Sequence, residues 1–105
     1  MAKTRLTRED AVALLKAATD QIAALGVRRL ALFGSVVRGE ARPGSDVDIL
    51  VDFEAGRKTF DNFLTLSELL ERLLDHRVDV VTVEALSPYI GPHILAEAED
   101  VLRAA

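Results

Sequence analysis

The sequence predicts one α/β (α+β) domain in which helices pack on a small β-sheet. Three segments repeat apolar residues at helical spacing, and three short, mainly apolar runs lie between them. The resulting order is helix, strand, turn, strand, helix, strand, helix, with no internal repeat, low-complexity stretch or linker. At 105 residues, of which 50% are hydrophobic, the chain has the length of one domain with a modest core. We therefore expect residues 1–105 to form a single domain.

Composition excludes several classes of protein. The net charge is −4 and no dense run of Lys and Arg is present, which argues against direct nucleic-acid binding. No apolar run has the length of a membrane span, and no secretory signal is visible at the N-terminus. Because there are no cysteines, neither disulfides nor thiolate zinc sites are available. We expect a cytoplasmic protein that does not bind a membrane.

The first predicted helix begins at Thr7 and ends before Gly26. Thr7 and Asp10 resemble a capping box, with Asp in place of the usual Glu, and Gly26 stands where a C-terminal cap belongs. Apolar residues at intervals of four and three define one face of this helix: Ala11, Leu15, Ala18, Ile22 and Leu25. A continuous helix of about five turns is therefore expected.

A strand over residues 29–33 follows and breaks at Gly34 and Ser35. Gly34 can adopt backbone angles closed to other residues and lets a ligand approach the main chain closely. Ser35 is expected to be the N-cap of a short helical turn that ends at Arg38. Because free N–H groups at a helix start attract anions, this turn predicts a cradle for phosphate.

The second strand opens with two aspartates, Asp46 and Asp48. Side chains alternate along a strand, so these two project from the same side, roughly 7 Å apart at Cα. The residues between and after them face the other way, into a core: Val47, Ile49, Val51 and Phe53. Two adjacent carboxylates repel each other, and a cation between them relieves the repulsion. Carboxylate oxygens and substrate phosphates are ligands that Mg²⁺ prefers, so this strand predicts a metal site.

Arg38 has two interpretations that its chemistry alone does not separate. Its planar guanidinium suits phosphate oxygens, and it equally suits a solvated surface position. Glu40, two residues on, is expected to pair with Arg38 or to lie as a charge at the helix end, and not to bind metal.

A further helix, capped by Asp61 or Asn62 and reaching about Asp75, presents a broad apolar stripe to the core. The strand after it, residues 78–83, is interrupted by one acid, Asp79. An acid in such a run is exposed, paired or bound to a cation.

The last helix is expected to start at Pro92 and to continue to about Arg103. The two histidines, His76 and His93, receive no catalytic role, because His76 suits a helix end and nothing in the sequence ties His93 to the aspartates.

A family resemblance rests on the spacing of these motifs. Gly34-Ser35, ten residues, then Asp46-Val47-Asp48 resembles the signature of the DNA polymerase β-like nucleotidyltransferase superfamily. The longer string FGSVVRGEARPGSDVDILV is similar to that of the minimal nucleotidyltransferases, or MNT proteins, which are about as long as this chain. The resemblance implies a polymerase β-like nucleotidyltransferase fold, with a small mixed sheet and a site open at one edge.

The resemblance also implies the site. Asp46 and Asp48 would hold the Mg²⁺ that accompanies a triphosphate, and Asp79 would complete the site of a second Mg²⁺; Mn²⁺ could replace either ion. By the same resemblance, Gly34 and Ser35 would bind the β- and γ-phosphates, and Arg38 would assist as a nucleotide ligand.

The reaction implied is transfer of AMP from ATP to a hydroxyl, with release of pyrophosphate. The implied partner is a HEPN-domain protein encoded nearby, with one of its tyrosines as the acceptor, as in toxin–antitoxin pairs. Two alternatives stay open: an antitoxin that neutralises its partner by binding alone, and nucleotidyl transfer to a small molecule. A homo-oligomer also stays open.

Overall fold

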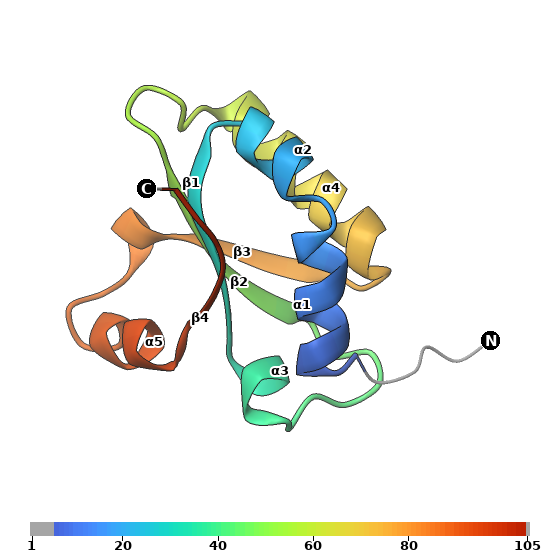
Figure 1. Cartoon of the computed structure of the whole chain (residues 1–105). Coiled ribbons are helices and arrows are strands. Elements are labelled where there is room, and N and C mark those ends of the chain that lie inside the picture. Colours follow the sequence, from blue (N-terminus) through green and yellow to red (C-terminus); the bar gives the residue numbers. More distant parts are fainter. Residues whose placement is uncertain (1–5, 105) are drawn as a thin grey trace.

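A four-stranded mixed sheet forms the centre of the molecule (Figure 1). The computed structural model describes residues 6–104. The strands are β1 (Val27–Phe33), β2 (Val47–Phe53), β3 (Val78–Thr82) and β4 (Glu99–Arg103), in the spatial order β3-β2-β1-β4. β1 is antiparallel to β2 and to β4, whereas β2 and β3 are parallel. The predicted mixed sheet with helices packed on it is confirmed.

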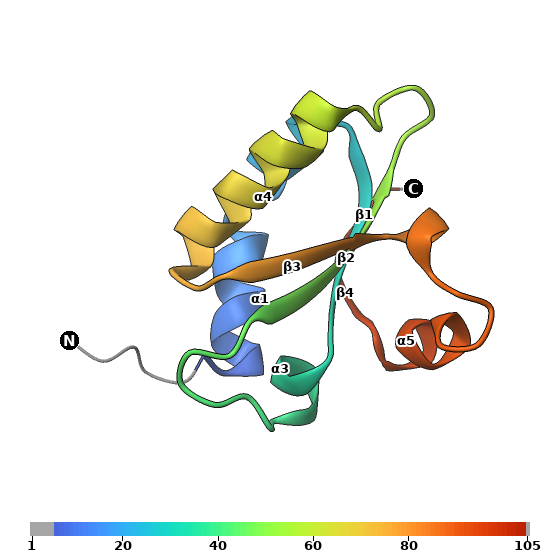
Figure 2. The same ribbon diagram turned by 180° about the vertical axis from the view of Figure 1, so that it is seen from behind.

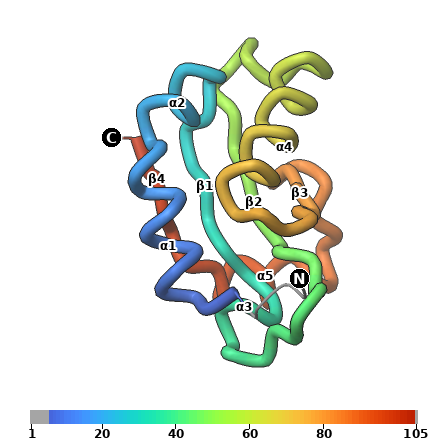
Figure 3. Tube along the Cα trace, turned by 90° about the vertical axis from the view of Figure 1, so that its right-hand side faces the viewer, coloured from blue at the N-terminus to red at the C-terminus, as the bar shows by residue number. Residues whose placement is uncertain are grey.

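Helices cover the two faces of the sheet unequally. They are α1 (Arg8–Lys16), α2 (Thr19–Ala24), α3 (Ser35–Arg38), α4 (Phe60–Leu74) and α5 (Gly91–Glu97), and a 3₁₀ turn spans Val83–Ala85. The helices α1, α2 and α4 lie on one face, and α5 lies on the other, where Val83 of the 3₁₀ turn also packs (Figures 1 and 2). Figure 3 looks onto the first face, with α1 and α2 at one side of β1 and α4 at the other. None of the helices within residues 6–104 is long and apolar enough to cross a membrane.

Strand alternation divides the core into a large and a small cluster. On β2, Ile49 and Val51 are fully buried in the large cluster, beneath α1, α2 and α4, as predicted. Leu50 points the other way and joins a small cluster with Phe33, which Ile94 of α5 covers in part. Asp48 has the same parity as Leu50, so it projects on the α5 face. The acidic residues of β2 thus lie on the side of the sheet that the main helical layer leaves open.

The predicted first helix is wrong in its continuity. α1 ends at Lys16, and α2 starts at Thr19 after a tight turn in which the N–H of Ala18 donates to the carbonyl of Leu15 at 3.0 Å. The predicted apolar face survives the break, since Leu15, Ala18 and Ile22 are all buried. Thr19 and the following Asp favour helix starts over helix interiors, which suits a second start at this point.

The predicted last helix over residues 92–103 is also wrong. α5 ends at Glu97, and Glu99–Arg103 form β4 against the free edge of β1. An ion pair of 2.7 Å between Arg29 Nε and Asp100 Oδ1 joins the two strands. Pairing with the edge of β1 satisfies backbone groups that a helix extension would leave open to water.

Two predicted caps are wrong, and a third is confirmed. Thr7 caps α1, its hydroxyl accepting a hydrogen bond from the N–H of Asp10 at 3.1 Å. α4 is capped by Thr59, and not by Asp61 or Asn62. The N-cap of α3 is Gly34, so Ser35 is the first residue within that helix and does not cap it.

Candidate functional site

Three acidic residues meet at one corner of the sheet, and Asp48 is central among them. In the parallel pairing of β2 with β3, Asp48 lies directly opposite Asp79, on strands about 4.8 Å apart. Asp46 immediately precedes β2 and is close enough for its charge to act on Asp48. Partial burial, followed by the negative charges of Asp79 and Asp46, raises the pKa of Asp48 above its ordinary value. Sheet register therefore gathers the three carboxylates that the sequence singles out.

The donor set suits a divalent cation. Within residues 6–104, no three acidic, histidine or cysteine side chains already stand in a metal-binding arrangement. Asp46 Oδ1 instead pairs with Arg77 Nε at 3.3 Å, and both side chains are largely exposed. Because each carboxylate makes ionisation of Asp48 more costly, a divalent ion at this corner would relieve the repulsion among them. The residues present thus fit Mg²⁺ by charge and by ligand chemistry.

Gly34 brings the main chain against this acidic corner. It follows β1 with φ 78° and ψ −152°, a conformation that is essentially restricted to glycine. A Cβ added here would overlap Asp48 Oδ2. Gly34 has the unusual backbone angles that the sequence predicts, and the group in close approach to it is the Asp48 carboxylate.

Replacing Gly34 by alanine should destabilise the fold by more than backbone strain alone. We expect a loss of about 1–3 kcal/mol from the positive φ, plus a further loss as the new methyl displaces Asp48. Urea denaturation measures the change. Gly56→Ala is the matched control, because Gly56 has φ 78° with open space around it, so it reports strain without overlap. Equal losses in the two variants would contradict the close approach of Gly34 to Asp48.

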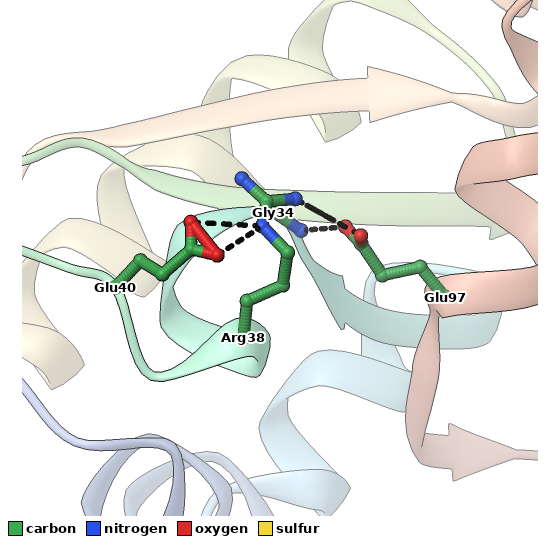
Figure 4. Close-up of polar contacts among 4 residues, drawn as sticks. All are labelled: Gly34, Arg38, Glu40 and Glu97. Carbon is green, nitrogen blue, oxygen red and sulfur yellow. Dashed lines mark hydrogen bonds and ion pairs between the residues drawn. The ribbon is translucent and has the colours of Figure 1, made fainter.

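An anion-binding corner adjoins the aspartates, and a glutamate fills it (Figure 4). Arg38 Nη1 contacts Glu97 Oε2 at 2.9 Å and Oε1 at 3.1 Å, and its Nε contacts Glu40 Oε1 at 3.3 Å. The backbone N–H of Gly34 donates to Glu97 Oε1 at 2.5 Å. These two donors hold the Glu97 carboxyl charged and lower its pKa, against the opposing effect of burial. The predicted pairing of Glu40 with Arg38 is confirmed.

These groups line a shared hollow of about 320 Å³. Its lining residues are Phe33, Gly34, Arg38, Asp48, Ile90, His93, Ile94 and Glu97. His93 thus lines the hollow, although nothing in the sequence ties it to the aspartates, and Ile90, Ile94 and Glu97 are lining residues that the sequence analysis does not identify. Pro92 indicates only where a helix starts. It does not show which side of that helix faces the aspartates.

Ser35 lies beside the hollow as the first residue of α3, and it is half-buried. Its carbonyl accepts a hydrogen bond from the N–H of Glu40 at 2.8 Å, which closes the short helix. Ser35 thus follows directly on the glycine whose N–H binds the Glu97 carboxylate.

Comparison with known proteins identifies relatives along nearly the whole chain. The nucleotidyltransferase domain family matches residues 14–101. The protein adenylyltransferase MntA of Thermococcus cleftensis is 44% identical over 93 residues, which cover 88% of this chain and 93% of that protein. The solved structure of a minimal nucleotidyltransferase is 41% identical, with a TM-score of 0.79, over 90% of this chain and 95% of that chain.

A more distant solved structure shares the fold. It is the complex of a tri-AMPylated HEPN toxin from Shewanella oneidensis with an MNT antitoxin. The match is 19% identical, with a TM-score of 0.62, and covers 89% of this chain and 73% of the other.

Proposed function

Because the chain belongs to the nucleotidyltransferase domain family, we propose that it transfers AMP from Mg-ATP to a hydroxyl group on a partner protein. Membership of this family makes the chain a nucleotidyltransferase. The observation that carries the proposal is the close approach of Gly34 to Asp48, which joins an anion-binding corner to a cluster of three carboxylates. A triphosphate with its metal needs both features side by side. The relative named as a protein adenylyltransferase supports AMP as the transferred group.

Three aspartates would hold the metal ions. Asp46 and Asp48 would bind the Mg²⁺ that arrives with the triphosphate, and Asp79 would belong to a second site beside it. When bound, Mg²⁺ supplies electrostatic stabilisation of the negative charge on the attacking and leaving oxygens. Asp79 is exposed on β3, which is an edge strand, so it faces the side from which a protein acceptor can arrive.

The anion-binding corner would orient the phosphates. The N–H of Gly34 would donate to a phosphate oxygen, Arg38 would bind through its planar fork, and Ser35 would contribute from the start of α3. The acceptor hydroxyl oxygen then attacks the α-phosphorus and its proton passes to solvent, while the bond between the α-phosphorus and the oxygen that bridges it to the β-phosphorus breaks. Pyrophosphate leaves, and AMP stays on the acceptor.

For the acceptor we propose a tyrosine of a HEPN-type protein encoded nearby. The structure of an MNT antitoxin with a tri-AMPylated HEPN toxin shares the fold of this chain and motivates the choice of partner. Such a pairing would make the chain the antitoxin of a toxin–antitoxin system, acting in the cytoplasm.

The test is an AMP-transfer assay with the purified chain, the neighbouring HEPN-type protein and ATP labelled at the α-phosphate. We expect label on the partner only with Mg²⁺ or Mn²⁺, and mass spectrometry should find AMP on a tyrosine. Calorimetry should show ATP binding that disappears in excess chelator, and ATP with metal should raise the melting temperature by mass action. Equally tight ATP binding without metal would contradict the site, and an inhibited but unmodified partner would favour neutralisation by binding alone.

A further inference from the structure

Glu97 occupies the corner that the proposed function assigns to phosphate. It is the last residue of α5, and 27% of its side chain is exposed. Its carboxylate accepts a hydrogen bond of 2.5 Å from the backbone N–H of Gly34 and two contacts of 2.9 and 3.1 Å from Nη1 of Arg38 (Figure 4). A planar anion with charge-assisted hydrogen bonds to these two donors is a close chemical substitute for a phosphate group.

We propose that Glu97 is an internal ligand of the phosphate corner, which an incoming triphosphate must displace, so that Glu97 sets the affinity for nucleotide. This inference rests on the proposed function, because it takes Gly34 and Arg38 as ligands of the triphosphate. It adds to that function a residue that opposes nucleotide binding.

The number of hydrogen-bond donors in the corner requires that a phosphate group displace the Glu97 carboxylate. Arg38 carries five N–H groups and can serve two anions at once, as it already does for Glu97 and Glu40. Gly34 has a single N–H, and its short bond to Glu97 Oε1 uses it fully. A phosphate oxygen can therefore reach the backbone donor only after the Glu97 carboxylate has left.

The negative charge of Glu97 also opposes the binding of a triphosphate. The Glu97 carboxylate is close enough to Asp48 to contribute to the raised pKa of that residue. A triphosphate brings further negative charge to the same corner, so repulsion with Glu97 adds to the competition for donors. Removing the charge of Glu97 relieves both effects.

The packing of α5 allows the side chain to leave without unfolding the helix. Ile94 and Ala98 pack against the small apolar cluster that contains Phe33, and this contact does not involve the Glu97 carboxylate. The side chain of Glu97 can therefore turn away while α5 stays on the sheet.

Glu97→Gln tests the inference directly, because glutamine keeps the shape and a neutral acceptor but loses the charge. We expect the Kd for Mg-ATP and for Mg-tripolyphosphate to fall about tenfold by calorimetry, the scale set by one competing charge-assisted contact. The KM for ATP should fall in parallel while kcat changes by less than about twofold. Glu97→Ala, which removes both contacts, should bind both probes at least as tightly as Glu97→Gln.

The matched control is Glu99→Gln. It makes the same change of charge two residues away, but Glu99 pairs with Arg8 at 2.6 Å and lies outside the corner. Its Kd for both probes should equal that of the unmodified protein. Melting curves of all three variants establish that the fold is retained, and Glu97→Ala carries the test if Glu97→Gln does not fold.

Unchanged or weaker binding in both Glu97 variants would overturn the inference, since Glu97 would then position Gly34 and Arg38 for the nucleotide. Tighter tripolyphosphate binding in a protein that transfers no AMP would keep the inference and overturn the proposed function. AMP transfer at the normal rate, with a Kd for Mg-ATP that is unchanged in both Glu97 variants, would keep the proposed function and overturn the inference. No binding of either probe by any form would overturn both.

Discussion

Asp48→Asn is expected to abolish AMP transfer and to weaken the binding of Mg-ATP. Asp48 lies between Phe33 of β1 and Asp79 of β3 and against Gly34, so it adjoins both the acidic cluster and the anion-binding corner. An amide keeps the shape but loses the charge that a divalent ion needs. We expect transfer to fall by at least about 10³-fold, or about 4 kcal/mol, in the α-labelled ATP assay.

The fold should survive this change. Burial and the neighbouring carboxylates raise the pKa of Asp48, so its charged form is disfavoured in the folded, metal-free protein. Its effect on stability is therefore unfavourable, and stability falls as the pH rises from the ordinary value of 3.8 through the raised pKa. At neutral pH without metal, the melting temperature of Asp48→Asn should hold steady or rise.

Asp52→Asn is the control on the same strand and face. Asp52 pairs with Arg28 at 2.8 Å, near the other end of β2, so its variant should transfer AMP at the normal rate. Retained transfer in Asp48→Asn, or a lowered melting temperature without metal, would contradict the role given to Asp48.

Much of the site could be predicted because its signals are local. The glycine that follows β1 and the pair of aspartates at the start of β2 need only a turn and a strand period to be recognised. Asp79 was visible as one acid in an apolar run, but its place depends on the parallel pairing of β3 with β2. No local pattern specifies that pairing. The sequence therefore indicates Asp79 as the neighbour of Asp48 only through the family resemblance, whereas the register of β2 and β3 sets the two residues opposite each other.

The opposite wall of the site could not be predicted, because non-local pairing overrides local periodicity there. Residues 92–103 carry helical spacing throughout, yet the chain leaves the helix after Glu97 to pair with β1. The ion pair between Arg29 and Asp100 joins residues 71 positions apart. This return along β1 accompanies the placement of α5 beside Asp48, where Glu97 and His93 line the hollow.

Asp79→Asn should leave the binding of Mg-ATP nearly unchanged and strongly reduce the transfer of AMP. Asp79 faces solvent on the edge strand β3, whereas Asp48 is half-buried beside the anion-binding corner. If Asp46 and Asp48 bind the metal that travels with ATP, loss of Asp79 should leave the Kd for Mg-ATP within about twofold of normal. Transfer should still fall by about 10²–10³-fold, a loss of about 3–4 kcal/mol of transition-state stabilisation on the acceptor side.

The measurements are ATP binding by calorimetry and AMP transfer to the HEPN-type partner, made on the same preparation of Asp79→Asn. Glu84→Gln is the control, because Glu84 lies just beyond the other end of β3, pairs with Lys58 at 3.5 Å and should leave both quantities unchanged. Removing one of three neighbouring negative charges should again hold or raise the metal-free melting temperature. Transfer at the normal rate would show that Asp79 is an exposed strand residue with no part in the reaction. A parallel loss of binding and transfer would instead place Asp79 with Asp46 and Asp48 on the metal that carries the nucleotide.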